Sequence, residues 1–183
     1  MKICKGALDG IFIIDAEPFN DDRGSFTRFF CPEELTDLFG SRSIKQLNSS
    51  VTKKPGSIRG MHFQLPPKME MKLVRCIKGS VWDVVVDLRK GSQTFLKWES
   101  IEISARNQKM VLIPEGFGHG FQVLDENSEL LYLHSQSYEP KLTGRVKYND
   151  PTLSIDWPLP VTDISLQDLN VPFLTDAFNG IEV

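Results

Sequence analysis

One stretch of the sequence, residues 57–75, brings a histidine together with several cations. It reads SIRGMHFQLPPKMEMKLVR and places His62, Arg59 and Lys72 among apolar residues that alternate as in half-buried strands. A histidine can remove a proton from a substrate, and fixed cations nearby would attract a substrate that carries phosphate groups. A lone histidine in a strand is more often structural, so it is the cations around His62 that favour a catalytic site.

The alternation of side chains along a strand places a geometric condition on this site. His62 and Gln64 are expected on one face of the strand and Arg59 on the other. Gly60 lies between Arg59 and His62, and glycine in a strand is typical of a β-bulge that re-aims a side chain. The site hypothesis therefore requires a bulge, which Gly60 can supply.

The histidines of the chain do not form a metal-binding motif. There are three, His62, His119 and His134, and the position that would complete His-x-His is occupied by Gln64. A catalytic zinc or iron site needs three or more converging side chains. We therefore expect neither a metal ion nor another cofactor.

Two further side chains could take part in chemistry, although each also fits an ordinary core. His119 lies in a glycine-rich turn, residues 113–121, for which a packed corner of a barrel is the simpler interpretation. Tyr132 shares a strand face with His134, and its phenol is either part of the core or a general acid that protonates an enolate. The residues around Asp168 do not by themselves indicate a function for it.

The overall composition is that of an ordinary globular protein. The chain has 183 residues, 40% hydrophobic and 25% charged, which suits one domain spanning 1–183. Because the net charge is −3 and no basic run occurs, we expect no nucleic-acid partner; we also expect no signal peptide and no membrane span. Cys4, Cys31 and Cys76 lack metal-ligand spacing, which favours reduced thiols in a cytoplasmic protein.

The pattern of apolar residues predicts many short strands. The strongest is 80–88, where Trp82, Val84 and Val86 form an apolar face and Asp83 and Asp87 point the other way. Further strands are expected at 11–14, 25–30, from 44 onwards, 72–77, 97–104, 109–113, 120–123 and 129–137, and short helices at 32–39 and 165–169. Short strands divided by turn residues at near-regular spacing indicate a β-sandwich or barrel.

Several segments, in order along the chain, closely resemble the dTDP-4-dehydrorhamnose 3,5-epimerase family. They are RGMHFQ (59–64), KLVR (72–75), WDVVVDLR (82–89), IPEGFGHGF (113–121), LY (131–132), YEP (138–140), NDP (149–151) and DWP (156–158). The resemblance runs from about residue 11 to 169. It implies a mainly β fold, the double-stranded β-helix or cupin jelly roll, with a few short helices, a metal-free site and a homodimer.

The resemblance also implies roles for individual residues. His62 would be the base that removes the proton beside the C4 ketone, oriented by Asp168, while Tyr132 is the acid on the opposite ring face. Lys72 would stabilise the enolate oxygen. The implied substrate contacts are Arg23, Arg59 and His119 to the diphosphate, Tyr138 stacked on the nucleotide base, Gln46 and Asn48 in the pocket wall, and Asp83 behind the site.

This chain departs from the family pattern in residues implied for ligand recognition. Arg28, two residues after Phe26, stands where the family usually has glutamate, and Thr143 replaces a second acidic contact near the sugar nucleotide. Other departures are Ser49, Leu133 and Ser137. Because the implied catalytic set is intact, these changes concern the nucleotide more than the reaction: dTDP is the family default, and Arg28 raises the possibility of CDP.

The sequence thus predicts an isomerase that inverts C3, C5 or both of a nucleoside-diphosphate 4-keto-6-deoxyhexose. The product would serve the synthesis of a deoxysugar for a surface polysaccharide or glycoside. Two alternatives remain open. One is a related ketoisomerase, which the presence of Tyr132 opposite His62 disfavours. The other is a non-catalytic cupin that binds sugar nucleotides.

Overall fold

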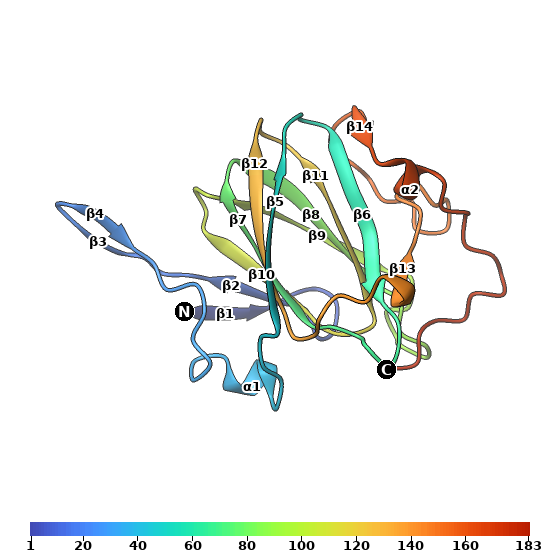
Figure 1. Cartoon of the computed structure of the whole chain (residues 1–183), viewed down its shortest axis with the longest axis horizontal. Coiled ribbons are helices and arrows are strands. Elements are labelled where there is room, and N and C mark those ends of the chain that lie inside the picture. The colour runs from blue at the N-terminus through green and yellow to red at the C-terminus, as the bar shows by residue number, and fades with distance from the viewer.

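Two six-stranded β-sheets face each other and form the body of the protein (Figure 1). The computed structural model describes residues 1–183. The first sheet has the order β1 (Lys2–Lys5), β2 (Phe12–Asp15), β10 (Lys109–Ile113), β7 (Lys72–Lys78), β12 (Ser128–His134), β5 (Gln46–Thr52). The second has the order β13 (Thr143–Arg145), β6 (Ser57–Gln64), β11 (Phe117–Val123), β8 (Ser80–Asp87), β9 (Trp98–Ser104), with β14 (Asp163–Ile164) also on β6. The predicted mainly β architecture is confirmed.

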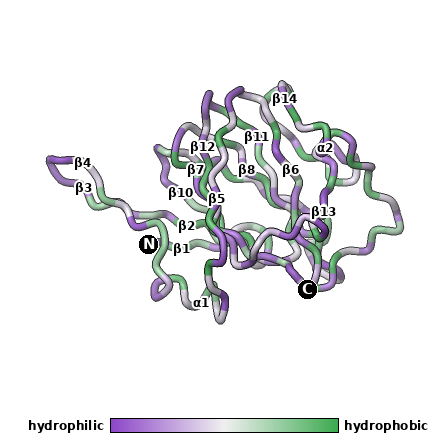
Figure 2. The backbone as a smooth tube through the Cα atoms, in the orientation of Figure 1, coloured by the Kyte–Doolittle hydropathy of each residue, from purple (hydrophilic) through white to green (hydrophobic).

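The alternation predicted for residues 80–88 is what builds the core. Val81 and Val85 of β8 face the space between the sheets, where they pack with residues of the first sheet such as Val74 and Val111. Val84 packs on the opposite face, beneath residues of the C-terminal segment, 146–181. Figure 2 shows hydrophobic residues along the strands of both sheets, and β10 and β11 are buried along almost their whole length. Each sheet therefore has one face turned to the interior, where a pocket can form.

The segment between β2 and β5 differs from its prediction. The residues expected to form a strand, 25–30, contribute only β4 (Gly24–Phe26), which pairs with β3 (Phe19–Asp21) in a separate hairpin. The chain then leaves that hairpin, and Phe29 and Phe30 pack on the first sheet instead of pairing with a neighbouring strand. The prediction was wrong there because alternation alone does not show which strand edge is free to pair.

The predicted helices are present but short. The first is α1 (Thr36–Phe39), which covers the outer face of the first sheet and ends at Gly40, whose φ is +56°. The second is α2 (Leu166–Leu169), and its N-cap is Ser165 as predicted. A single 3₁₀ turn, η1 (Pro140–Leu142), joins β12 to β13. No helix in the structure has the length and apolar surface needed to span a membrane.

Candidate active site

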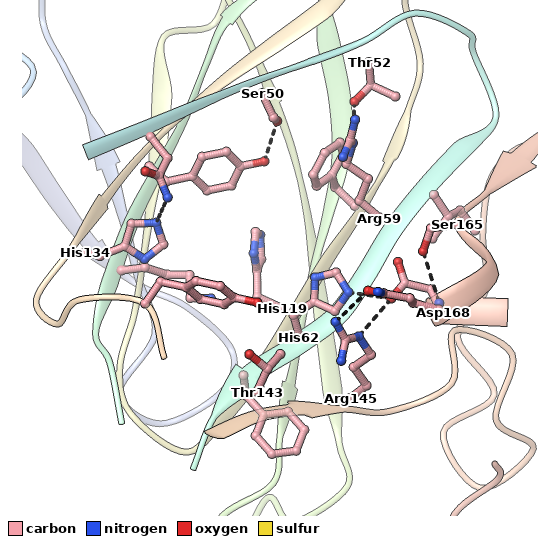
Figure 3. Close-up of a pocket in the computed structure, with 18 of the residues that line it drawn as sticks. Ser50, Thr52, Arg59, His62, His119, His134, Thr143, Arg145, Ser165 and Asp168 are labelled. Carbon is pink, nitrogen blue, oxygen red and sulfur yellow. Dashed lines mark hydrogen bonds and ion pairs between the residues drawn. The ribbon is translucent and has the colours of Figure 1, made fainter. Parts of the chain in front are cut away.

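A cavity of about 880 Å³ lies between the two sheets and is the main candidate for a ligand site (Figure 3). Its walls come from β5, β7 and β12 of the first sheet, β6, β11 and β13 of the second, and α2. That volume is typical of pockets that bind organic ligands. The chemistry of the cavity is therefore set by which side chains of each strand point inward.

The bulge required at Gly60 is present. Along the pair of β6 and β11, His62 is opposite His119 while Arg59 is opposite Phe121, so β6 has one residue more than its partner between these positions. Gly60 has φ of +127°, and a Cβ there would lie 2.4 Å from the Cα of Gly120. Arg59 and His62 consequently both line the cavity, as the site hypothesis required.

His62 is paired with Asp168, which lies 106 residues further along the chain. The His62 Nε2 and Asp168 Oδ1 atoms are 2.6 Å apart (Figure 3). The backbone N–H of Asp168 donates to the Oγ of Ser165, so the N-cap of α2 fixes the carboxylate in place. Burial acts most strongly and raises the pKa of Asp168, but its bonds with His62 and Ser165 outweigh burial, and the pKa lies below its usual value. The carboxylate is thus charged at neutral pH and can orient the imidazole.

Tyr132 approaches the same cavity from the other sheet. It lies on β12, and its hydroxyl is 2.8 Å from the Oγ of Ser50 on β5 (Figure 3). Burial raises the pKa of the Tyr132 phenol, and the bond with Ser50 only partly offsets this. The phenol therefore stays protonated and can act as a proton donor. The cavity thus has an imidazole on the second sheet and a phenol on the first.

Lys72 is held by a carboxylate that the sequence analysis missed. The Lys72 Nζ is 2.9 Å from the Oε1 of Glu70, and the Oε2 of Glu70 is 2.8 Å from the Nδ1 of His134. Burial, the largest influence, raises the pKa of Glu70, but the bond with His134 and the charge of Lys72 lower it to about 2. The sequence held a partial signal for this contact: residues 70 and 72 are two apart, as are residues 132 and 134, and side chains two apart share a strand face. In the structure β7 pairs with β12, which brings the two faces together.

Arg59 provides a cation without a carboxylate partner. Its Nε donates to the Oγ1 of Thr52 at 2.8 Å, and the guanidinium makes no salt bridge. Its charge is therefore available to an anionic ligand. On the neighbouring strand, the Nε2 of His119 is 2.8 Å from the Oδ2 of Asp83, which is fully buried behind the cavity.

The remaining predicted binding residues differ in where they lie. Asn48, Tyr138 and Thr143 line the cavity. Gln46 is set back from it, where it donates to Asn48 and accepts from the backbone N–H of Tyr138. A further cation that the sequence analysis did not single out, Arg145 of β13, also lines the cavity and has its Nε 3.4 Å from the Oδ1 of Asp168 (Figure 3).

Three predicted binding residues lie outside the cavity of their own chain. Arg23 and Phe26 belong to the β3–β4 hairpin, which projects away from the body of the protein (Figure 1). The side chain of Arg23 is 90% exposed and pairs with Asp21, and Phe26 is 73% exposed. Arg28 follows the hairpin and pairs with Glu34 at 2.5 Å. Their implied contacts with substrate stay predictions, because one chain does not bring them to the site.

Comparison with known sequences gives one family. The profile described as dTDP-4-dehydrorhamnose 3,5-epimerase matches residues 5–176. The dTDP-4-dehydrorhamnose 3,5-epimerase of Salmonella typhimurium is 37% identical over 179 residues, which is 97% of each chain.

Solved structures give the same answer. A dTDP-6-deoxy-D-glucose-3,5-epimerase from Legionella pneumophila, in complex with dTDP-4-keto-L-rhamnose, matches with a TM-score of 0.92 at 34% identity and covers 100% of this chain and 98% of that one. NovW of Streptomyces spheroides, described as a 4-keto-6-deoxy sugar epimerase, has a TM-score of 0.89 at 34% identity and covers 94% and 87% of the two chains. The predicted cupin-type jelly roll is confirmed. The chain belongs to the dTDP-4-dehydrorhamnose 3,5-epimerase family.

Proposed function

We propose that this protein is an isomerase that inverts C3, C5 or both of a nucleoside-diphosphate 4-keto-6-deoxyhexose. The observation that carries this proposal is the placement of an oriented base, His62 with Asp168, and a protonated phenol, Tyr132, on opposite sheets around one cavity. The names of the two structural relatives support the class of substrate, because one holds a dTDP-4-keto sugar and the other is described as acting on 4-keto-6-deoxy sugars.

The reaction follows from these positions. His62 removes the proton on the carbon beside the C4 ketone, and the electron pair moves to the ketone oxygen to give an enolate. Lys72 lies in the cavity wall and stabilises the developing negative charge, which is a strong effect in a site sheltered from water. Tyr132 then donates a proton to the same carbon from the opposite face, so the centre is inverted. A well-placed acid or base contributes roughly 10²–10⁴-fold to such a rate.

The rest of the substrate is bound by the polar walls. Arg59, whose charge is not compensated by a carboxylate, and His119 contact the diphosphate, and Tyr138 stacks on the base. We place the enzyme in the cytoplasmic synthesis of a deoxysugar for a surface polysaccharide or glycoside, a placement supported by the descriptions of the two structural relatives as deoxysugar epimerases, one of them from the novobiocin biosynthetic gene cluster.

The test is proton NMR in D₂O with a panel of 4-keto-6-deoxyhexose nucleotides. We expect solvent deuterium to appear at C3, C5 or both, together with the signals of the inverted sugar. Binding without exchange would instead identify a non-catalytic binding protein. Movement of the carbonyl without inversion would identify a ketoisomerase.

We also propose that the protein is a homodimer. The β3–β4 hairpin exposes Phe19 (68%) and Phe26 (73%), and the outer face of β5 exposes Leu47 (61%) and Val51 (50%). Apolar groups gathered in this way favour contact with another protein surface. Contact with a second copy would also give Arg23 and Phe26 a route to a cavity, that of the partner.

The expected result of sedimentation or light scattering is a mass twice that of the 20.8 kDa chain. Phe26→Glu should shift the protein towards monomer, because it places a charge in the proposed contact. Asp22→Glu, at the exposed tip of the same hairpin, is the matched control and should leave the dimer intact. A wild-type protein of single-chain mass at micromolar concentration would contradict the proposal.

The nucleotide is the finer part of the proposal, and it depends on Arg28. Thymine presents an N3–H donor that needs an acceptor, whereas arginine only donates; cytosine presents N3 and O2 as adjacent acceptors. An unsatisfied buried donor costs about 1–3 kcal/mol, so we expect CDP to bind roughly ten- to a hundredfold more tightly than dTDP. In its own chain Arg28 pairs with Glu34, so this contact would be made in the partner's cavity.

Calorimetric titration with CDP and dTDP measures this preference. Arg28→Ala should reduce it to near unity, while Arg106→Ala should preserve it, because Arg106 is in the turn after β9 and does not line the cavity. Equal binding of the two nucleotides by the wild-type protein, or tighter binding of dTDP, would show that Arg28 does not read the base.

A further inference from the structure

A single carboxylate in the cavity wall contacts two side chains that come from different strands. Glu70 offers Oε1 to the ammonium of Lys72 on β7 and Oε2 to the imidazole of His134 on β12, at 2.9 and 2.8 Å. All three side chains are largely buried, with exposures of 10%, 8% and 12% for Glu70, Lys72 and His134. These groups are therefore held in a shared geometry and are not screened by water.

The division of the carboxylate between two partners leaves Lys72 with free donors. An ammonium has three N–H groups, and Glu70 is the only hydrogen-bond or ion-pair partner of the Lys72 side chain. The other oxygen of Glu70 is bonded to His134, so the carboxylate contacts Lys72 through one oxygen only. The ammonium of Lys72 is thus held in one position by Glu70, and two of its N–H groups are available to a ligand oxygen in the cavity.

His134 extends the arrangement to the phenol of Tyr132. The two rings are stacked, with centroids 6.0 Å apart and planes inclined by 22°. The Nε2 of His134 is 3.4 Å from the Nδ2 of Asn48 (Figure 3). Asn48 in turn accepts from Gln46. With a carboxylate at Nδ1 and an amide N–H at Nε2, the network assigns the ring hydrogen to Nδ1 and fixes the ring plane.

We propose that Glu70 and His134 form a clamp that positions Lys72 and Tyr132 relative to each other in the epimerisation, an inference that rests on the function proposed above. Neither residue reacts with the sugar, so both are positioning residues. Glu70 acts by holding the cation that meets the enolate oxygen, and His134 acts by orienting Glu70 and by supporting the ring of Tyr132. The clamp therefore links the stabilisation of the enolate by Lys72 to its protonation by Tyr132.

Variants of Glu70 test the first half of the clamp. Glu70→Gln keeps the shape but removes the charge that holds Lys72, so we expect kcat for deuterium exchange to fall about a hundredfold, with KM changed less than threefold. Glu70→Asp should recover part of this loss. Glu126→Gln is the matched control, because Glu126 is exposed in the turn before β12, and it should behave as wild type. Exchange within threefold of wild type in Glu70→Gln, or a loss confined to KM, would overturn the inference.

Two variants of His134 separate its two contacts. His134→Asn keeps a donor near Glu70 but removes the stacked ring, so inversion should fall about tenfold more than exchange. His134→Phe keeps a ring on Tyr132 but removes the donor to Glu70, so exchange and inversion should fall together. If the two variants give the same ratio of exchange to inversion, His134 does not link Glu70 to Tyr132 and the clamp is wrong.

A readout without substrate separates this inference from the proposed function. An ammonium that is ordered and shielded from water exchanges its protons slowly, so ¹⁵N-resolved NMR should show a signal for Lys72 that is absent from Lys72→Met. We expect Glu70→Gln to lose this signal and Glu126→Gln to keep it. Persistence of the signal in Glu70→Gln overturns the clamp, whereas its loss together with an inactive wild-type protein overturns the proposed function alone.

Discussion

Replacement of His62 by alanine is expected to abolish the incorporation of solvent deuterium at every carbon that the enzyme epimerises. All three cavity histidines are paired with carboxylates, but His62, at 2.6 Å from Asp168, has a side chain that is 38% exposed, whereas those of His119 and His134 are 6% and 12% exposed. Without it the imidazole left on that sheet is His119, which is buried against Asp83 and which we assign to the diphosphate, so the loss should be about 10²–10⁴-fold. Exchange measured by NMR in D₂O with the preferred substrate gives the rate directly.

Nucleotide binding provides the control for this variant. Arg59 and Tyr138, which we assign to the diphosphate and the base, do not depend on the imidazole, so calorimetric titration of His62→Ala should give nearly wild-type affinity. Asp168→Asn should show a milder loss, because it removes only the orienting carboxylate. Exchange at a near-native rate in His62→Ala would mean that another group is the base.

Much of this site was predictable because its determinants are local in the sequence. The bulge at Gly60 followed from the need to bring Arg59 and His62 together, and the structure has it. Ser165 was predicted as an N-cap, and its bond with the backbone of Asp168 is what fixes the carboxylate. Alternation likewise predicted the two faces of β8, although the face predicted as apolar, with Val84 and Val86, packs under the C-terminal segment and not between the sheets. The meeting of His62 and Asp168 could not follow from either segment alone, since it depends on β14 and α2 packing beside β6.

The features that sequence reasoning missed are pairings between distant segments. Spacing places Glu70 on the same face as Lys72, but the contact of its second oxygen with His134 depends on the register of β7 against β12, which spacing does not give. Arg145 meets Asp168 because β13 pairs with β6 and places it opposite His62. The projecting β3–β4 hairpin was missed for a different reason. Alternation along a strand indicates which face is apolar, but it does not indicate whether the same chain covers that face.

Replacement of Tyr132 by phenylalanine is expected to uncouple exchange from inversion. Phenylalanine preserves the ring that stacks on His134 and meets the edge of His119, and removes only the hydroxyl bound to Ser50. His62 can still remove the proton and return one from solvent to the same face, so deuterium enters with the original configuration. Inversion needs a donor on the opposite face, and it should fall about 10²–10⁴-fold.

Comparison of deuterium content with the amount of inverted sugar, in one NMR time course, measures this uncoupling. Ser50→Ala is the matched control: it removes the hydroxyl that contacts the phenol but leaves the donor, so inversion should fall much less than in Tyr132→Phe. Because burial keeps the phenol protonated to high pH, inversion by the wild type should not decline through the neutral range by loss of this proton. If Tyr132→Phe loses exchange as completely as inversion, Tyr132 takes part in proton removal and its assignment as the opposing acid is wrong.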